Sequence, residues 1–186
     1  VLNVRRPPFD DARARRALAL AVDRDTLAAR VLRSGETAAY GIVPPRATNY
    51  PVPVQADFAA WPQPRRVAEA RTLLGQAGYG PARPLRFELT YGSGDVARRV
   101  AVALGAMWKA AGIEAALAPS EAKAALAAVQ RGEFQAFRFQ WLGGTTDPVS
   151  FLERFTSAAR GVNLSGYVNP EYDALYARAE RTRELG

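Results

Sequence analysis

One stretch of the sequence, residues 134–152, combines residue types that could hold a small ligand. Arg138 stands among aromatic and apolar residues, so its guanidinium is either paired within the core or directed at an anion. The ring of Trp141 offers a flat surface for an apolar group. Gly143 and Gly144 lack a Cβ atom, so the backbone there can turn with φ > 0 or lie directly against a ligand. Stacking and hydrogen bonding are therefore the chemistry that this stretch predicts.

The flanking elements predict where this stretch lies in the fold. Phe137, Phe139 and Trp141 recur at every second position, which predicts a β-strand over residues 134–142. Asp147, which is followed by proline, is typical of a helix N-cap. Ligands of α/β sheets bind just beyond the carboxyl ends of strands, so we expect the site at this junction. The junction residues are Leu142, Gly143, Gly144, Thr145, Thr146 and Asp147.

Composition excludes several classes of function. A chain of 186 residues with 48% apolar content can bury the core of one globular domain. It has no cysteine and no histidine, which excludes disulfides, thiolate chemistry and histidine acid/base catalysis, and we expect neither a metal nor a cofactor. The net charge of +7 comes mostly from arginines scattered through alanine-rich helical segments, which indicates solvated helix faces rather than a nucleic-acid surface. No apolar run of about 18 residues and no charged leader is present, so we expect neither a membrane span nor a signal peptide within it.

The rest of the chain alternates predicted strands and helices, which is typical of an α/β fold with a mainly parallel sheet flanked by helices. Predicted strands cover residues 1–6, 84–91 and 113–118, and predicted helices begin near Asp11, Arg65, Asp95, Glu121 and Asn169. Residues 41–64 contain six prolines together with aromatic residues, which predicts a packed loop. Among the predicted inward positions are Val96, Val100, Ala103, Leu104, Met107 and Ala111 in the helix from Asp95, Leu126 and Val129 in the helix from Glu121, and Leu175 and Ala179 in the last helix.

A second stretch suggests a different function. Residues 92–97, G-S-G-D-V-A, match G-x-G-x-x-A between a strand and a helix, so a nucleotide-dependent α/β enzyme using Gly92 to Ala97 is the alternative hypothesis. Asp95 at the helix start would repel a pyrophosphate, and the expected acidic partner, Glu114, falls near the start of its strand. A plain turn capped by Asp95 is the simpler interpretation. Since no spacing brings two carboxylates together for acid/base catalysis, we expect a protein that is not an enzyme.

Five ordered motifs cover nearly the whole chain. They are RPPFDDARARRALALAVDR at residues 6–24, VPP at 43–45, LLGQAGY, MWKAAGIEA, and WLGGTTDPVSFL followed by NLSGYVNPEYDALYARA. In this order they resemble the extracytoplasmic solute-binding proteins of ABC transporters, in the peptide/opine/nickel class. The resemblance implies that residues 1–186 are most of a single lobe of a two-lobed protein, with a hinge strand near residues 1–6 and a missing second lobe. It also implies a periplasmic location, capture of a peptide or other small solute between the lobes, and delivery to an ABC permease in the membrane.

The resemblance also implies roles for single residues. Peptide-binding members carry an aspartate three residues after the tryptophan of the motif, which holds the peptide's ammonium group, and here that residue is Gly144. Two further positions depart from oligopeptide binders, because Ala122 replaces an aromatic residue and Ala97 a basic one. Arg138 matches a basic position that faces ligand carboxylates. We therefore expect a site that keeps an anion contact and lacks the ammonium contact.

Overall fold

The chain folds into two compact units in the computed structural model. The described residues are 1–48, 50, 52–141, 146–159 and 161–182. The first unit comprises Val1–Ala38 and Ala60–Phe139, and the second comprises Ala39–Ala59 and Gln140–Gly186. Within the described ranges, no helix is both long and apolar enough to cross a membrane. That residues 1–186 act as one lobe stays a prediction.

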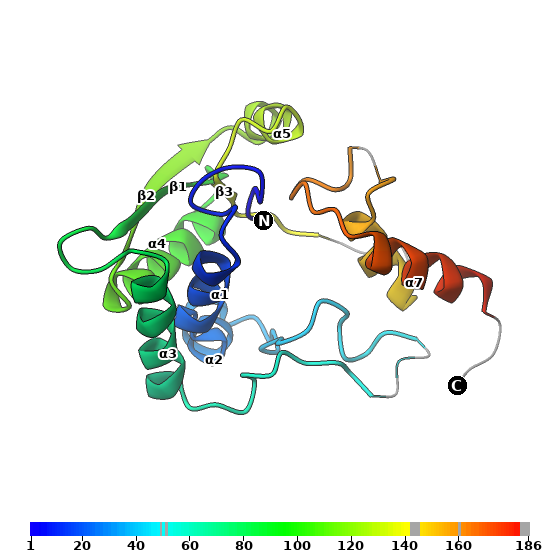
Figure 1. The fold of residues 1–186 in the computed structure, drawn as a ribbon, viewed down its shortest axis with the longest axis horizontal. Helices are drawn as coiled ribbons and strands as arrows, with labels where there is room; N and C mark the ends of the chain where they lie inside the picture. The colour runs from blue at the N-terminus through cyan, green and yellow to red at the C-terminus, as the bar shows by residue number, and fades with distance from the viewer. Residues whose placement is uncertain (49, 51, 142–145, 160, 183–186) are drawn as a thin grey trace. The chain divides into compact units, whose positions relative to one another are not determined.

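The first unit contains a parallel three-stranded sheet with the strand order β2-β1-β3 (Figure 1). β1 (Leu85–Gly92) pairs along its whole length with β2 (Ile113–Ser120), with Leu85 opposite Ile113. On its other side β1 pairs with the short β3 (Ala136–Phe137). The predicted α/β fold with a mainly parallel sheet is confirmed.

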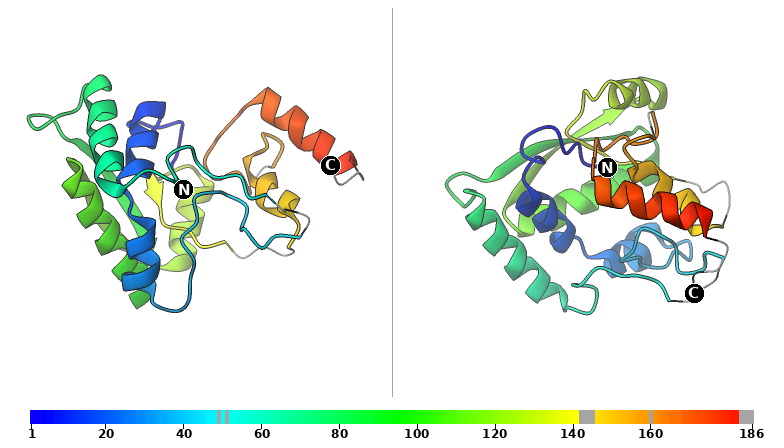
Figure 2. Two further views of the ribbon diagram at one scale, coloured as in Figure 1. Left: turned by 90° about the horizontal axis from the view of Figure 1, so that it is seen from below. Right: turned by 45° about the vertical axis from the view of Figure 1, so that its right-hand side comes forward.

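Helices of the first unit pack around this sheet. They are α1 (Ala12–Ala21), α2 (Arg24–Thr26), the π-helical η1 (Leu27–Leu32), α3 (Gln63–Gln76), α4 (Asp95–Ala110) and α5 (Ala122–Gln130). Figures 1 and 2 show α4 running along the sheet, with α1 and α3 side by side. α3 and α4 end as their sequences predict, since Gly78 and Gly112 follow them with φ of +82° and +87°, a conformation that favours glycine.

The core of the first unit lies between the sheet and these helices. Phe87 of β1 contacts Phe9 and Trp108 edge to face, with ring centroids 5.1 and 5.2 Å apart. The indole N–H of Trp108 donates to the carbonyl of Leu18 at 3.2 Å, so its one polar atom is satisfied inside the core. The burial of β1 alternates along the strand, which confirms its predicted pattern.

The predicted inward face of α4 is correct at Ala111, the buried C-cap residue, and wrong at Val96. Val96 is 47% exposed, whereas Ala97, Ala101 and Trp108 are buried. The helix turns its bulky indole into the core and brings its alanines against the strands, because small residues let a helix approach a sheet closely. Alanine and valine surround this helix almost evenly, so periodicity alone could not fix the face. The predicted cap is also wrong, since Gly94 is the N-cap and Asp95 is the first helical residue.

The strand predicted over residues 134–142 is reduced to Ala136–Phe137. Its alternation is absent as well, because Phe134, Ala136 and Phe137 are all buried. One reason lies in Gln135, whose side-chain oxygen accepts the backbone N–H of Glu88 at 2.8 Å. This side chain therefore satisfies the donor on β1 that a longer strand would pair with its backbone.

The hinge strand predicted near residues 1–6 is likewise shortened. A single antiparallel bridge joins Leu2 to Ala136. The N–H of Asn3 donates to the carbonyl of Gln135 at 2.9 Å, and the Asn3 amide donates to the carbonyls of Gly132 and Phe134, both at 3.1 Å. The N-terminal segment thus covers the outer edge of β3 but turns away after three residues.

The second unit combines a long loop with short helices. It contains the loop of residues 39–59, α6 (Pro148–Leu152), the 3-10 turn η2 (Glu153–Phe155) and α7 (Pro170–Arg181). The Tyr172 hydroxyl on α7 donates to the carbonyl of Leu152 at 2.7 Å. Among its described apolar residues only Val43 and Phe58 are buried, so the predicted packed loop supplies that small core. The predicted inward position of Leu175 is wrong, since this side chain is 52% exposed.

Candidate functional site

Arg138 lies at the end of β3, in the first unit. Its N–H donates to the carbonyl of Thr90 at 2.8 Å, which continues the β1–β3 pairing by one residue. The side chain is half-buried. Its guanidinium has no ion pair or hydrogen bond to any residue that the structure describes. Of the two roles that the sequence left open, pairing within the core is therefore not observed in this part of the chain.

Trp141 belongs to the second unit, where it contacts a residue that the sequence did not single out. The Arg154 guanidinium carbon lies 3.5 Å from the centroid of the Trp141 ring, in cation–π geometry. Trp141 nevertheless remains 43% exposed, so part of the indole is available to a ligand. The sequence could not predict this contact, because it depends on the turn from α6 into η2, which brings Arg154 over the ring.

The centre of the predicted site, Leu142, Gly143, Gly144 and Thr145, lies outside the described residues. Thr146, which follows it, is exposed and paired with Thr48, whose N–H donates to the Thr146 carbonyl at 2.8 Å. The two threonine hydroxyls also lie 2.5 Å apart. The loop of residues 39–59 therefore anchors the C-terminal end of the junction.

Asp147 is the N-cap of α6, as the sequence predicts. Its Oδ1 atom accepts the N–H of Val149 at 2.8 Å, and Pro148 occupies the first helical position. The carbonyl of Asp147 accepts both the N–H and the hydroxyl of Ser150, at 3.1 and 2.7 Å. The carboxylate is thus committed to the helix start, which makes it a poor substitute for an ammonium-binding aspartate.

The glycine stretch of residues 92–97 does not form a dinucleotide site. Asp95 lies in the first turn of α4, where a pyrophosphate would need to bind, and its carboxylate is exposed. Glu114 is the second residue of β2, at the end of the sheet opposite this loop. Its Oε2 atom accepts a hydrogen bond from Nε of Arg86 at 2.6 Å. Two requirements of the fingerprint are therefore unmet.

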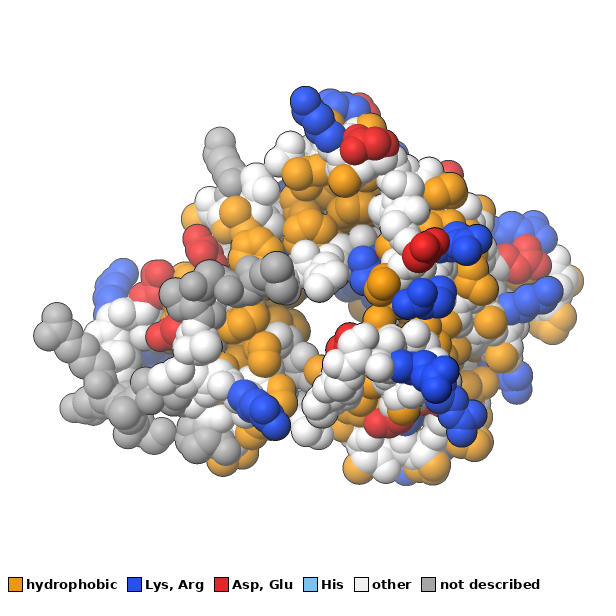
Figure 3. All heavy atoms as spheres, turned by 180° about the vertical axis from the view of Figure 1, so that it is seen from behind, with side chains coloured by type: hydrophobic (Ala, Val, Ile, Leu, Met, Phe, Trp, Pro, Cys, Tyr) orange, Lys and Arg blue, Asp and Glu red, His pale blue; other side chains and the backbone are white. Residues whose placement is uncertain are grey.

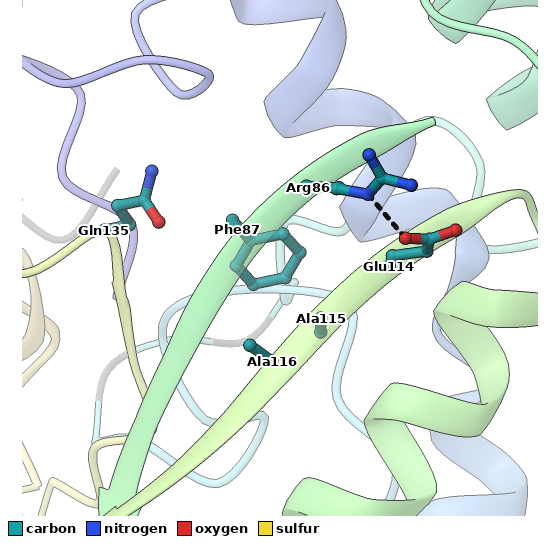
Figure 4. A pocket seen from close by; sticks show the side chains of 6 residues that line it. All are labelled: Arg86, Phe87, Glu114, Ala115, Ala116 and Gln135. Carbon is teal, nitrogen blue, oxygen red and sulfur yellow. Dashed lines mark hydrogen bonds and ion pairs between the residues drawn. The ribbon is translucent and has the colours of Figure 1, made fainter. Parts of the chain in front are cut away.

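A surface depression of about 460 Å³ lies over the sheet, lined by Arg86, Phe87, Glu114, Ala115, Ala116 and Gln135. Figure 4 shows Arg86 and Glu114 facing each other across β1 and β2, with Gln135 on the other side of Phe87. Its polar groups already have partners, since the Gln135 amide donates to the carbonyl of Pro7 at 2.9 Å besides its bond to β1. The Arg86 and Glu114 side chains are thus paired with each other, and the Gln135 side chain is engaged by the backbone at both ends.

Metal and nucleic-acid chemistry find little support. No cluster of three or more acidic side chains that could hold a metal ion occurs in the described ranges. On the face shown in Figure 3, lysine and arginine side chains are interspersed with acidic and apolar ones. The most specific geometry for a ligand is therefore the indole of Trp141 with the guanidinium stacked on it.

Comparison with known proteins identifies the family. The sequence profile of the bacterial extracellular solute-binding proteins, family 5 Middle, matches residues 1–163. The chain belongs to this family, as its motifs predict. It is 33% identical over 177 residues to the periplasmic oligopeptide-binding protein OppA of Escherichia coli strain K12, covering 95% of this chain and 32% of that protein. It is 38% identical over 178 residues to the probable deoxycholate-binding periplasmic protein YgiS of the same strain, covering 95% and 33%.

The fold agrees with this assignment. The crystal structure of Haemophilus influenzae OppA in complex with the peptide RPPGFSPFR superposes with a TM-score of 0.94 at 30% identity, covering 99% of this chain and 36% of that one. The chain thus spans about a third of the length of these relatives. All three are binding proteins by name, and none of them supports the nucleotide-dependent alternative.

Proposed function

We propose that this chain is most of one lobe of the substrate-binding component of an ABC importer. The component works in the periplasm, captures a peptide-like or other small solute between two lobes, and delivers it to a membrane permease. The observation that carries the proposal is the family match, which runs through the whole stretch from Arg138 to Asp147. In this proposal the second lobe belongs to the part of the full-length protein that corresponds to the remaining two thirds of the relatives' length.

We further propose that the solute is neutral or anionic rather than a peptide with a free amino terminus. A buried ammonium group needs a carboxylate or several acceptors, because leaving a charge unpaired costs several kcal/mol. Gly144 supplies no side chain at the position where peptide-binding relatives carry aspartate, and Asp147 caps α6. The 38% identity to a protein named for deoxycholate, a steroid carboxylate without an ammonium group, supports the same class of solute.

Calorimetry of the full-length protein tests this proposal. We expect short peptides with a free amino terminus to bind no more tightly than their amino-acetylated forms. Tight binding that is lost on acetylation would show that another carboxylate holds the ammonium group, and the proposed solute class would be wrong.

A single substitution provides the complementary test. Gly144→Asp restores a carboxylate at the missing anchor, so it is expected to raise the affinity for free-amino peptides about tenfold or more. Gly75→Asp is the matched control, because it adds the same charge in α3 where an added Cβ meets nothing within 4 Å. An equal gain in both variants would indicate long-range electrostatics instead of a local contact.

A further inference from the structure

Arg154 is a charged group that contacts Trp141 of the candidate site. α6 has only five residues and passes directly into η2, which brings the guanidinium of Arg154 over the ring of Trp141 at 3.5 Å. This contact limits the freedom of the guanidinium, whose planar fork of N–H donors is suited to binding a carboxylate or phosphate.

The hydrogen-bonding capacity of Arg154 is unused. Its Nη2 atom is buried and has no hydrogen-bond partner, and no hydrogen bond or ion pair joins the side chain to any described residue. Burial lowers the pKa of Arg154, while the neighbouring Glu153 acts in the opposite direction. A buried N–H donor without an acceptor is costly, so an anionic acceptor at Nη2 is favoured, and the described residues supply none.

We propose that Arg154 contacts the solute directly and binds a carboxylate while the apolar part of the solute lies against Trp141. This inference rests on the proposed function, and it makes the solute class more specific. A site with glycine at the position of the ammonium-binding aspartate, and with an arginine over Trp141, favours an anionic group over a cationic one. The solute is therefore a molecule with a carboxylate next to a flat apolar body, or an amino-blocked peptide with a free carboxyl end.

A carboxylate from the rest of the full-length protein is the competing partner of Arg154. The two cases differ in the ligand-free protein. If a protein carboxylate pairs with Arg154, removing the guanidinium leaves that carboxylate buried and unpaired, and the protein loses stability. If the solute is the partner, the ligand-free protein carries an uncompensated cation, and its removal is neutral or stabilising.

The test uses the full-length protein with Arg154→Met, which keeps an apolar stem on the ring, and Arg154→Lys, which keeps the charge without the planar fork. Arg178→Met is the matched control, an exposed arginine of α7 in the same unit. Four probes are measured by calorimetry: deoxycholate below its micellar concentration, deoxycholate methyl ester, N-acetyl-trialanine and N-acetyl-trialanine amide. The first and third carry a carboxylate, and the second and fourth are their uncharged counterparts.

We expect wild type to prefer at least one carboxylate probe over its uncharged counterpart. Arg154→Met should weaken that probe about tenfold or more and change its counterpart by less than about twofold. Arg154→Lys should fall between, and Arg178→Met should match wild type. The melting temperature of ligand-free Arg154→Met should stay within about two degrees of wild type or rise. The carboxylate probe that Arg154→Met weakens shows whether the site prefers a steroid-like or a peptide carboxylate.

Two results overturn the inference while the proposed function stands: unchanged carboxylate binding by Arg154→Met, or a melting temperature lowered by several degrees with normal binding. The second would identify a structural ion pair with the rest of the protein. A wild-type protein that binds none of the four probes but binds free-amino peptides overturns both the inference and the proposed solute class. The wild-type titrations therefore test the proposed solute class, and the Arg154→Met measurements test the role of Arg154.

Discussion

Replacing Arg138 by leucine is expected to weaken solute binding and leave the fold intact. The backbone N–H of Arg138 donates to the carbonyl of Thr90, and leucine keeps that bond. Because the guanidinium makes no ion pair or hydrogen bond within the described part of the chain, its removal breaks no observed contact. The melting temperature should therefore change by no more than a few degrees.

The expected loss in affinity follows from the type of bond. A hydrogen bond to a charged group contributes about 1.5–3 kcal/mol, which corresponds to roughly 10- to 150-fold in the dissociation constant. Calorimetry of the full-length protein with deoxycholate or N-acetyl-trialanine measures this loss. The effect should persist at high salt, because a buried pair is screened less than an exposed one.

Arg99→Leu is the control for Arg138→Leu, since Arg99 is an exposed arginine of α4 in the same unit. It removes the same charge and should bind like wild type. The reasoning fails if Arg138→Leu unfolds at a much lower temperature while its folded fraction binds normally. Arg138 would then be paired inside the full-length protein instead of facing the solute.

Three further predictions concern stability and fragment behaviour. Trp108→Ala should destabilise the first unit by about 3–5 kcal/mol in urea unfolding, because it removes a buried ring that packs on Phe87. Trp108→Phe should cost about 1–3 kcal/mol, since the Leu18 carbonyl loses its donor. The pKa of Asp11 is lowered from 3.8 to about 2, chiefly by hydrogen bonds from the Arg13 side chain. Wild type should therefore melt above Asp11→Asn at pH 6, and this advantage should disappear as the pH falls from about 4 to about 2. The isolated chain of residues 1–186 should fold but bind the four probes at least tenfold more weakly than the full-length protein, because in the proposed function a second lobe supplies about half of the site.

For each of these predictions, one measured result would contradict it. A Trp108→Phe variant as unstable as Trp108→Ala would show that the indole N–H, and not the ring, dominates this part of the core. A difference between wild type and Asp11→Asn that stays constant from pH 6 to pH 2 would exclude the ionised Asp11 as its source. Sub-micromolar binding by the isolated chain would show that one lobe holds the complete site.

The sequence alone determined the features that depend on neighbouring residues. The caps at Asp147 and Asn169 and the glycines after α3 and α4 were predicted at the correct positions. The sequence narrowed the cap of α1 to Asp10 or Asp11, and the structure places it at Asp11. Capping is a contact between a side chain and backbone groups two or three residues away, so local sequence specifies it. The alternation of β1 is local in the same sense, since it needs only one buried face along a single strand.

Only the tertiary structure decided the features that depend on distant partners. The length of β3 depends on Gln135 reaching Glu88 and on the N-terminal segment pairing with Ala136. The inward face of α4 depends on how its indole packs against Phe87, and the stacking of Arg154 on Trp141 depends on the turn between α6 and η2. Such contacts join residues whose separation along the chain carries no periodic signal, so their geometry follows from packing, and no local pattern encodes it.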